Sequence, residues 1–150
     1  LCRQSLMMAP SAQSKDALAM ALCLAGEPDG AIDLYLQIFA SMPAGQIFHF
    51  GKLVLPLAQS GQIERALEYA DLCTIYHPGD FFSWVLRCNI LAQLGNLDGA
   101  KADLLQAQKL MPSLNLQNLI SGMVRSYGRT ESQRQGLTSG YARVLKSSGT

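Results

Sequence analysis

The sequence has little charge, two histidines and no paired cysteine motif, and each shortage excludes a class of protein. Charged residues make up 15% of the 150 residues and apolar residues 49%, a balance that excludes a disordered chain. Uncharged stretches such as residues 41–51 carry proline, glycine or polar residues and fall well short of the ~20 apolar residues of a membrane span. We therefore expect one folded domain with a continuous core and no transmembrane helix.

Recognisable catalytic and metal-binding motifs are also missing. Neither His49 nor His77 belongs to a nucleophile motif, and no HExxH, P-loop or GxGxxG pattern occurs. The cysteines form no CxxC pair and show no regular spacing with histidine, which argues against a zinc or thioredoxin-like site. They are Cys2, Cys23, Cys73 and Cys88. We expect no enzyme activity, metal or cofactor, and interpret the cysteines as small buried hydrophobes in a reducing, cytoplasmic compartment.

Charge is spread unevenly along the chain. Residues 1–114 hold 7 Lys and Arg against 10 Asp and Glu, a net charge of −3, whereas residues 115–150 hold 5 against 1, a net charge of +4. Such a tail could contact an acidic partner or phosphate, but charges on amphipathic helices are more often a solvated face. Direct nucleic-acid binding is disfavoured because the body is acidic and no aromatic residues interleave a basic stripe.

One phrase recurs three times, in residues 21–43, 56–78 and 90–112, in steps of 35 and then 34 residues. Its four aligned columns are Leu22, Leu57 and Leu91; Gly26, Gly61 and Gly95; Ala31, Ala66 and Ala100; Pro43, Pro78 and Pro112. Glycine can end a first helix with a positive φ, alanine lets a second helix cross the first closely, and proline stops the second helix. The period therefore indicates a solenoid of helical hairpins.

This pattern resembles the tetratricopeptide repeat. The third unit carries the family's aromatic residue as Trp84, whereas the first unit departs from the pattern, with Lys15 where an aromatic is expected and Ile38 at a usually small position. The resemblance implies an all-α, right-handed superhelix of antiparallel helix pairs, with units at 12–45, 47–80 and 81–114. Cys73 and Cys88 then fall at small positions between helices, which favours packing over redox chemistry.

The two ends of the chain differ from the repeats. Residues 1–11 are interpreted as the second helix of a preceding partial repeat, because Pro10 lies 33 residues before Pro43; an independent cap is the alternative. The start has neither an initiator methionine nor a signal-peptide pattern, so we expect the parent protein to extend upstream.

After Pro112, residues 115–150 predict capping helices. An apolar face at helical spacing runs from Leu116 to Tyr127, and a capping box follows, with Thr130 as N-cap and Gln133 reaching back. Gly136 and Gly140 would each weaken the closing helix by roughly 1 kcal/mol relative to alanine, although they could permit close approach to another helix.

The resemblance also implies where a partner would bind. In tetratricopeptide folds the first helix of each hairpin lines the concave face, and carrying those positions over gives a mainly apolar groove. Its residues are Met20, Phe48, Leu55, Phe82, Val85 and Asn89. Such a groove suits an amphipathic helix or an extended segment of another protein. The alternatives are self-association through this face and a groove already filled by the chain's own helices.

Residues 100–145 further resemble the C-terminal tetratricopeptide region of bacterial winged-helix transcription regulators and class III adenylate cyclase-like proteins. This resemblance implies a non-catalytic module that binds a protein, or a second copy of itself, and so controls a distant output domain. A stand-alone chaperone of the type III secretion class, which holds an apolar client segment, is the alternative; an enzyme comes third.

Overall fold

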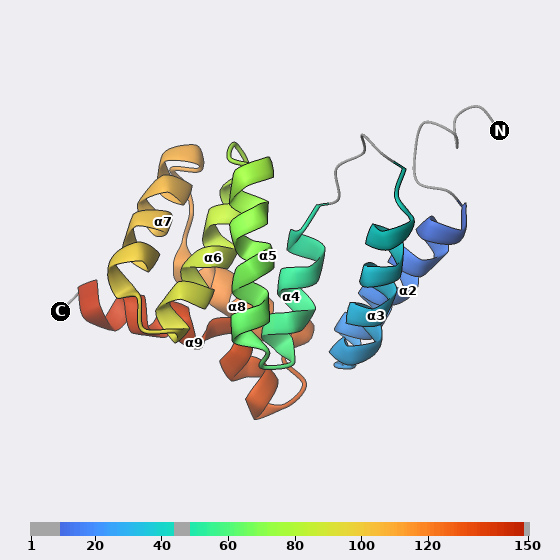
Figure 1. Ribbon diagram of the computed structural model, residues 1–150. Coiled ribbons are helices and arrows are strands. Elements are labelled where there is room, and N and C mark those ends of the chain that lie inside the picture. The colour runs from blue at the N-terminus through green and yellow to red at the C-terminus, as the bar shows by residue number, and fades with distance from the viewer. Residues whose placement is uncertain (1–9, 44–48, 149–150) are drawn as a thin grey trace.

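The computed structural model describes residues 10–43 and 49–148, which form eight α-helices and no β-strand (Figure 1). The helices are α2 (Pro10–Leu24), α3 (Pro28–Ser41), α4 (Gly51–Gln59), α5 (Ile63–Tyr76), α6 (Phe81–Gln93), α7 (Leu97–Leu110), α8 (Leu116–Tyr127) and α9 (Glu131–Ser148). The predicted all-α class is thus confirmed for these residues. None of these helices combines the length and the apolar character that crossing a bilayer requires.

Consecutive helices pack against each other in chain order. The pairs α2–α3, α4–α5 and α6–α7 are each joined by a short turn, and α3 packs on α4 as α5 does on α6. Figure 1 shows α3 to α7 standing side by side as a row. Each predicted repeat from residue 12 to residue 114 therefore contributes one pair of neighbouring helices.

The repeated glycines form the turns inside these pairs. Gly26, Gly61 and Gly95 have φ of 80°, 83° and 91°, which a side chain would strain. The residue after each glycine donates its N–H to the carbonyl of the repeated leucine five residues back, at 2.8–2.9 Å, which is the Schellman arrangement. The glycine column and the leucine column are thus two parts of one helix ending.

The alanine and proline columns also have structural roles. Ala31, Ala66 and Ala100 are fully buried where the second helix of each pair packs. Each repeated proline lies two residues beyond the last residue of α3, α5 or α7. Proline cannot continue a helix, because it lacks an N–H and disfavours helical backbone in the residue before it.

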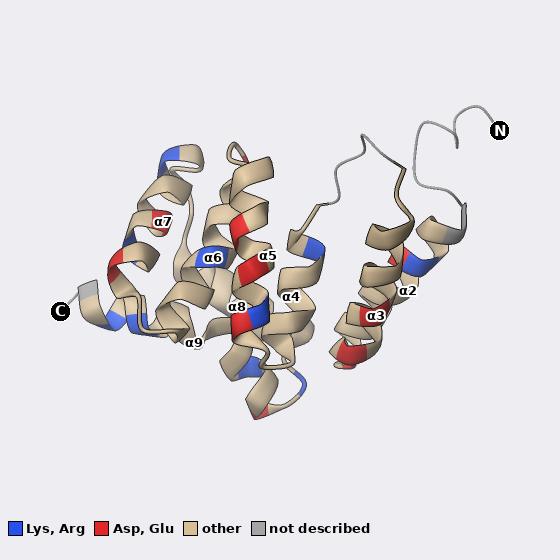
Figure 2. Ribbon diagram, in the orientation of Figure 1, with Lys and Arg blue, Asp and Glu red and all other residues tan. Residues whose placement is uncertain are grey.

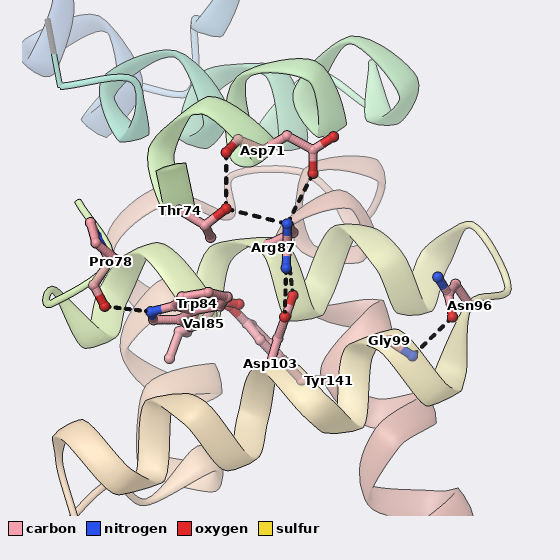
Figure 3. A network of polar contacts seen from close by, with 10 residues as sticks. All are labelled: Asp71, Thr74, Pro78, Trp84, Val85, Arg87, Asn96, Gly99, Asp103 and Tyr141. Atoms are coloured by element: carbon pink, nitrogen blue, oxygen red, sulfur yellow. Dashed lines mark hydrogen bonds and ion pairs between the residues drawn. The ribbon is translucent and has the colours of Figure 1, made fainter. Parts of the chain in front are cut away.

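A polar network fixes α6 between its neighbours (Figure 3). Arg87 donates to both carboxylate oxygens of Asp103 on α7, at 2.8 and 2.9 Å, and to Asp71 and Thr74 on α5, both at 3.2 Å. Trp84 donates to the carbonyl of Pro78 at 2.8 Å, and the Arg87 guanidinium lies 5.3 Å from the centre of its ring. The network joins the second and third pairs.

The expected helix end at Pro10 is wrong, whereas the capping box expected at Thr130 and Gln133 is formed in part. Pro10, expected to end an upstream helix, is instead the first residue of α2, a position that tolerates proline; the helix expected before it lies outside the described residues. Thr130 accepts the N–H of Gln133 at 3.1 Å, as the capping box predicts. The side chain of Gln133 accepts from the N–H of Arg129 rather than Thr130, and donates to the carbonyl of Gly26 at 2.8 Å.

Candidate functional site

Helix α9 covers part of the predicted groove. It runs along one side of the row and packs on α4 and α6 (Figure 1). Gly136 lies against the backbone carbonyl of Ala58 in α4, and Gly140 lies against that of Asn89 in α6, so closely that a Cβ on either glycine would overlap the carbonyl oxygen. The two glycines therefore allow a close approach to other helices, which was one of the two effects expected of them.

Two of the predicted groove residues, Val85 and Asn89, form hydrogen bonds with α9 where it crosses α6. The side-chain oxygen of Asn89 accepts the N–H of Gly140 at 2.9 Å, and its amide donates to the carbonyl of Gly136 at 3.1 Å. The hydroxyl of Tyr141 donates to the carbonyl of Val85 at 3.0 Å. Val85 and Asn89 are 0% and 3% exposed, so neither can reach an external partner while α9 is in place.

Basic residues of the tail help to hold α9. Arg129 donates to the carbonyl of Leu24 at 3.0 Å, and Arg143 donates to those of Ala92 and Gln93 at 3.2 and 3.1 Å. These carbonyls lie at the C-terminal ends of α2 and α6, where helices carry unpaired acceptors and partial negative charge. Figure 2 shows basic residues along α9 and the loop before it, and acidic residues on α3, α5 and α7.

Three of the four remaining predicted residues lie away from this crossing. Met20 on α2, Leu55 on α4 and Phe82 on α6 line one cavity of about 200 Å³, which we call the anchor cavity. Its other lining residues are Cys23, Tyr35, His49, Gly51, Lys52, Met123 and Tyr127. Phe48 lies outside the described residues. The first helices of all three pairs therefore meet at this cavity, and α8 contributes one of its walls.

Two pairs of charged or polar groups involve residues that line this cavity. The ammonium of Lys52 lies 2.8 Å from a carboxylate oxygen of Asp16, and Nε2 of His49 lies 3.4 Å from a carboxylate oxygen of Asp80. The His49 ring also stacks on His77, with ring centres 4.3 Å apart. Because about a third of each Lys52 and Asp16 side chain is exposed, the pair contributes only about 0–1 kcal/mol and can rearrange around a ligand.

Two residues in the wall of the cavity, Cys23 and Tyr35, are buried, and their ionisable groups stay protonated at neutral pH. Burial raises the pKa of the Cys23 thiol to about 11, so this cysteine stays protonated at neutral pH and is a poor nucleophile. Burial likewise raises the pKa of Tyr35, whose neighbours include Cys23, Asp16 and Tyr127. Within residues 10–43 and 49–148, no group of three or more His, Cys, Asp or Glu side chains could hold a metal ion.

Sequence reasoning missed four of the residues that line the anchor cavity. Cys23 belongs to the inner side of α2, Tyr35 belongs to α3, and Met123 and Tyr127 belong to α8. The groove was carried over from first helices alone, which leaves out second helices and the capping helix. The apolar spacing that predicted α8 includes Met123 and Tyr127, but spacing alone does not reveal against which pair they pack.

A comparison of the chain with protein-family models and with curated proteins found no match. The resemblance to tetratricopeptide proteins therefore remains a prediction that rests on the repeat columns.

Proposed function

We propose that this chain is a non-catalytic, tetratricopeptide-type interaction module that binds a segment of another protein through the anchor cavity. The observation that carries the proposal is the meeting of Met20, Leu55 and Phe82, from three different helices, at one largely apolar cavity. Apolar side chains that face an unfilled cavity lose contacts that a partner's side chain would restore. A single inserted side chain would thus supply much of the binding energy, as anchors do in protein interfaces.

The size of the cavity favours a side chain over a free ligand. Sites for drug-sized ligands usually measure about 300–1,000 Å³. The anchor cavity, at about 200 Å³, is smaller than that range but large enough for one bulky side chain. Two other residues of the predicted groove, Val85 and Asn89, are covered by α9, so the partner segment would contact the described part of the chain mainly around this cavity.

The wider role follows from the sequence resemblance. We propose a cytoplasmic regulatory or sensory region of a bacterial transcription regulator or signalling protein, in which partner binding controls a separate output domain. A type III secretion chaperone that holds an apolar client segment, and self-association through the same cavity, are the alternatives. All three place an apolar side chain in the anchor cavity, so one set of variants tests their shared feature.

The test uses a displayed library of random peptides selected against the wild-type chain. We expect the selected peptides to share one bulky apolar residue and to lose at least about ten-fold in affinity for Leu55→Asp, which places a charge at the cavity. Leu55→Phe, which adds volume without charge, should weaken binding as well. The matched control is Leu105→Asp on α7, because Leu105 is exposed and lies away from the cavity.

Far-UV circular dichroism and the melting temperature of each variant must stay close to wild type for the comparison to hold. Equal losses for Leu105→Asp and Leu55→Asp, or selected peptides without a shared apolar residue, would contradict the proposal.

A further inference from the structure

A wall of the anchor cavity carries a polar group that no part of the described chain uses. Tyr35 is 1% exposed and lines the cavity, and its hydroxyl forms no hydrogen bond with residues 10–43 and 49–148, although it is not one of their fully buried unpaired groups. A hydroxyl that still touches solvent is paired with water, and a ligand that displaces this water loses affinity unless it replaces the hydrogen bond. A ligand in the cavity could supply that hydrogen bond.

The other walls suit an aromatic ring. Phe82 and Tyr127 offer aromatic surfaces, and Met20 and Met123 offer thioether sulfurs, which make favourable contacts with ring edges. Among the described residues, the hydroxyl of Tyr127 has only the sulfur of Met20 as a partner, at 3.9 Å, and thioether sulfur is a weak acceptor. A ligand oxygen would be a better acceptor for it.

The volume of the anchor cavity agrees with that of a single six-membered aromatic ring that carries a small substituent. An engineered apolar cavity of about 150 Å³ in another protein stays dry and binds benzene. The anchor cavity, at about 200 Å³, has room for a benzene ring and one or two further heavy atoms. Phenol and p-cresol have this size, and so does the side chain of tyrosine.

We propose that the side chain that fills the anchor cavity is a tyrosine, whose ring packs between Phe82 and the methionines and whose hydroxyl forms a hydrogen bond with that of Tyr35. The inference rests on the proposed function, because it names the anchor residue of the partner segment. Two hydroxyl groups suit each other, since each can donate one hydrogen bond and accept another.

Two probes of nearly equal shape test the hydroxyl separately from the ring. p-Cresol carries a hydroxyl where p-xylene carries a methyl group. Both dissociation constants are measured by NMR titration of the methionine methyl signals, for wild type and for Tyr35→Phe. We expect both probes to bind near Met20 and Met123, and the ratio of the two constants to shift three- to ten-fold toward p-xylene in Tyr35→Phe, the size of one hydrogen bond.

The matched control is Tyr69→Phe on α5, which removes the hydroxyl of a half-buried tyrosine that does not line the cavity. This variant should keep the wild-type ratio. An unchanged ratio in Tyr35→Phe would overturn the tyrosine assignment while leaving an apolar anchor in place. Failure of both probes to bind the wild-type chain would overturn it as well.

The proposed function fails in a different way. If the peptides selected against the chain bind Leu55→Asp as tightly as wild type, the cavity is not the partner site, whatever the probes do. If Leu55→Asp weakens peptide binding but the anchor residue of the peptides is not tyrosine, the interaction module stands and the tyrosine inference is wrong.

Discussion

The crossing of α9 over the helix row predicts opposite effects for one substitution at two glycines. Gly140 and Gly122 both lie inside helices, where replacing glycine by alanine usually stabilises a protein by up to about 1 kcal/mol. A Cβ at Gly122 would meet no atom within 4 Å. A Cβ at Gly140 would overlap the backbone carbonyl oxygen of Asn89 and lie 2.6 Å from its side-chain oxygen.

The loss of stability expected for Gly140→Ala depends on which part of the structure has to move to make room for the new Cβ. The obstacle at Gly140 is largely backbone, so α9 itself has to shift away from α6. Overpacking of this kind typically costs about 1–3 kcal/mol. The shift also weakens the hydrogen bond from Gly140 to Asn89, which contributes about 0.5–1.5 kcal/mol. After subtraction of the helix-propensity gain, we expect Gly140→Ala to lower the free energy of unfolding by about 1–3 kcal/mol, and Gly122→Ala to leave it unchanged or raise it.

Urea unfolding followed by circular dichroism measures both values under the same conditions. A lower midpoint with an unchanged slope would show reduced stability rather than a change in the denatured state. Gly136→Ala, which would collide with the carbonyl of Ala58, should behave like Gly140→Ala. Equal or greater stability of Gly140→Ala relative to Gly122→Ala would refute the close crossing of α9.

Two further predictions concern the core. Arg87→Met leaves the Asp103 carboxylate, whose side chain is 4% exposed, without its main partner, and should lower the free energy of unfolding by at least about 2 kcal/mol; adding Asp103→Leu should restore most of the loss in thermal unfolding. The pKa values of Cys23 and Cys88 are raised to about 11 and about 12 from an ordinary value of 9.0. Because these thiols ionise first in the unfolded chain, stability should be fully present below about pH 9 and fall as pH rises toward these values, and replacing both by alanine should flatten that fall in urea titrations.

The turns of the repeats could be predicted from sequence because their physics is local. A glycine with positive φ, the bond from the next N–H to a carbonyl five residues back, and a proline beyond the second helix involve only neighbouring residues. Gly61 and Pro78, for example, behave as their columns predict. The burial of Ala66 and Ala100 follows from the same periodicity, since each lies on the inner side of a second helix.

The position of α9 could not be predicted in this way, because its contacts join residues far apart in the chain. Asn89 and Gly140 are 51 positions apart, and Gln133 and Gly26 are 107 apart. Locally, Gly136 and Gly140 predict only a weak helix. In the structure, these glycines matter because they lack a side chain at two points where the backbone of another helix passes. Local sequence patterns do not show which backbone that is.

The same long-range contacts determine where the chain can bind a partner. Gln59, which is fully buried, donates to the carbonyls of Cys23 and Tyr127 at 2.9 and 2.8 Å, and so joins α4 to α2 and to the end of α8. Met123 and Tyr127, from α8, form one wall of the anchor cavity. The cavity is therefore built jointly by the helix pairs and the C-terminal helices. Because α9 covers Val85 and Asn89 while α8 leaves Met20, Leu55 and Phe82 bordering open space, the C-terminal helices both shorten the predicted groove and shape the part of it that remains.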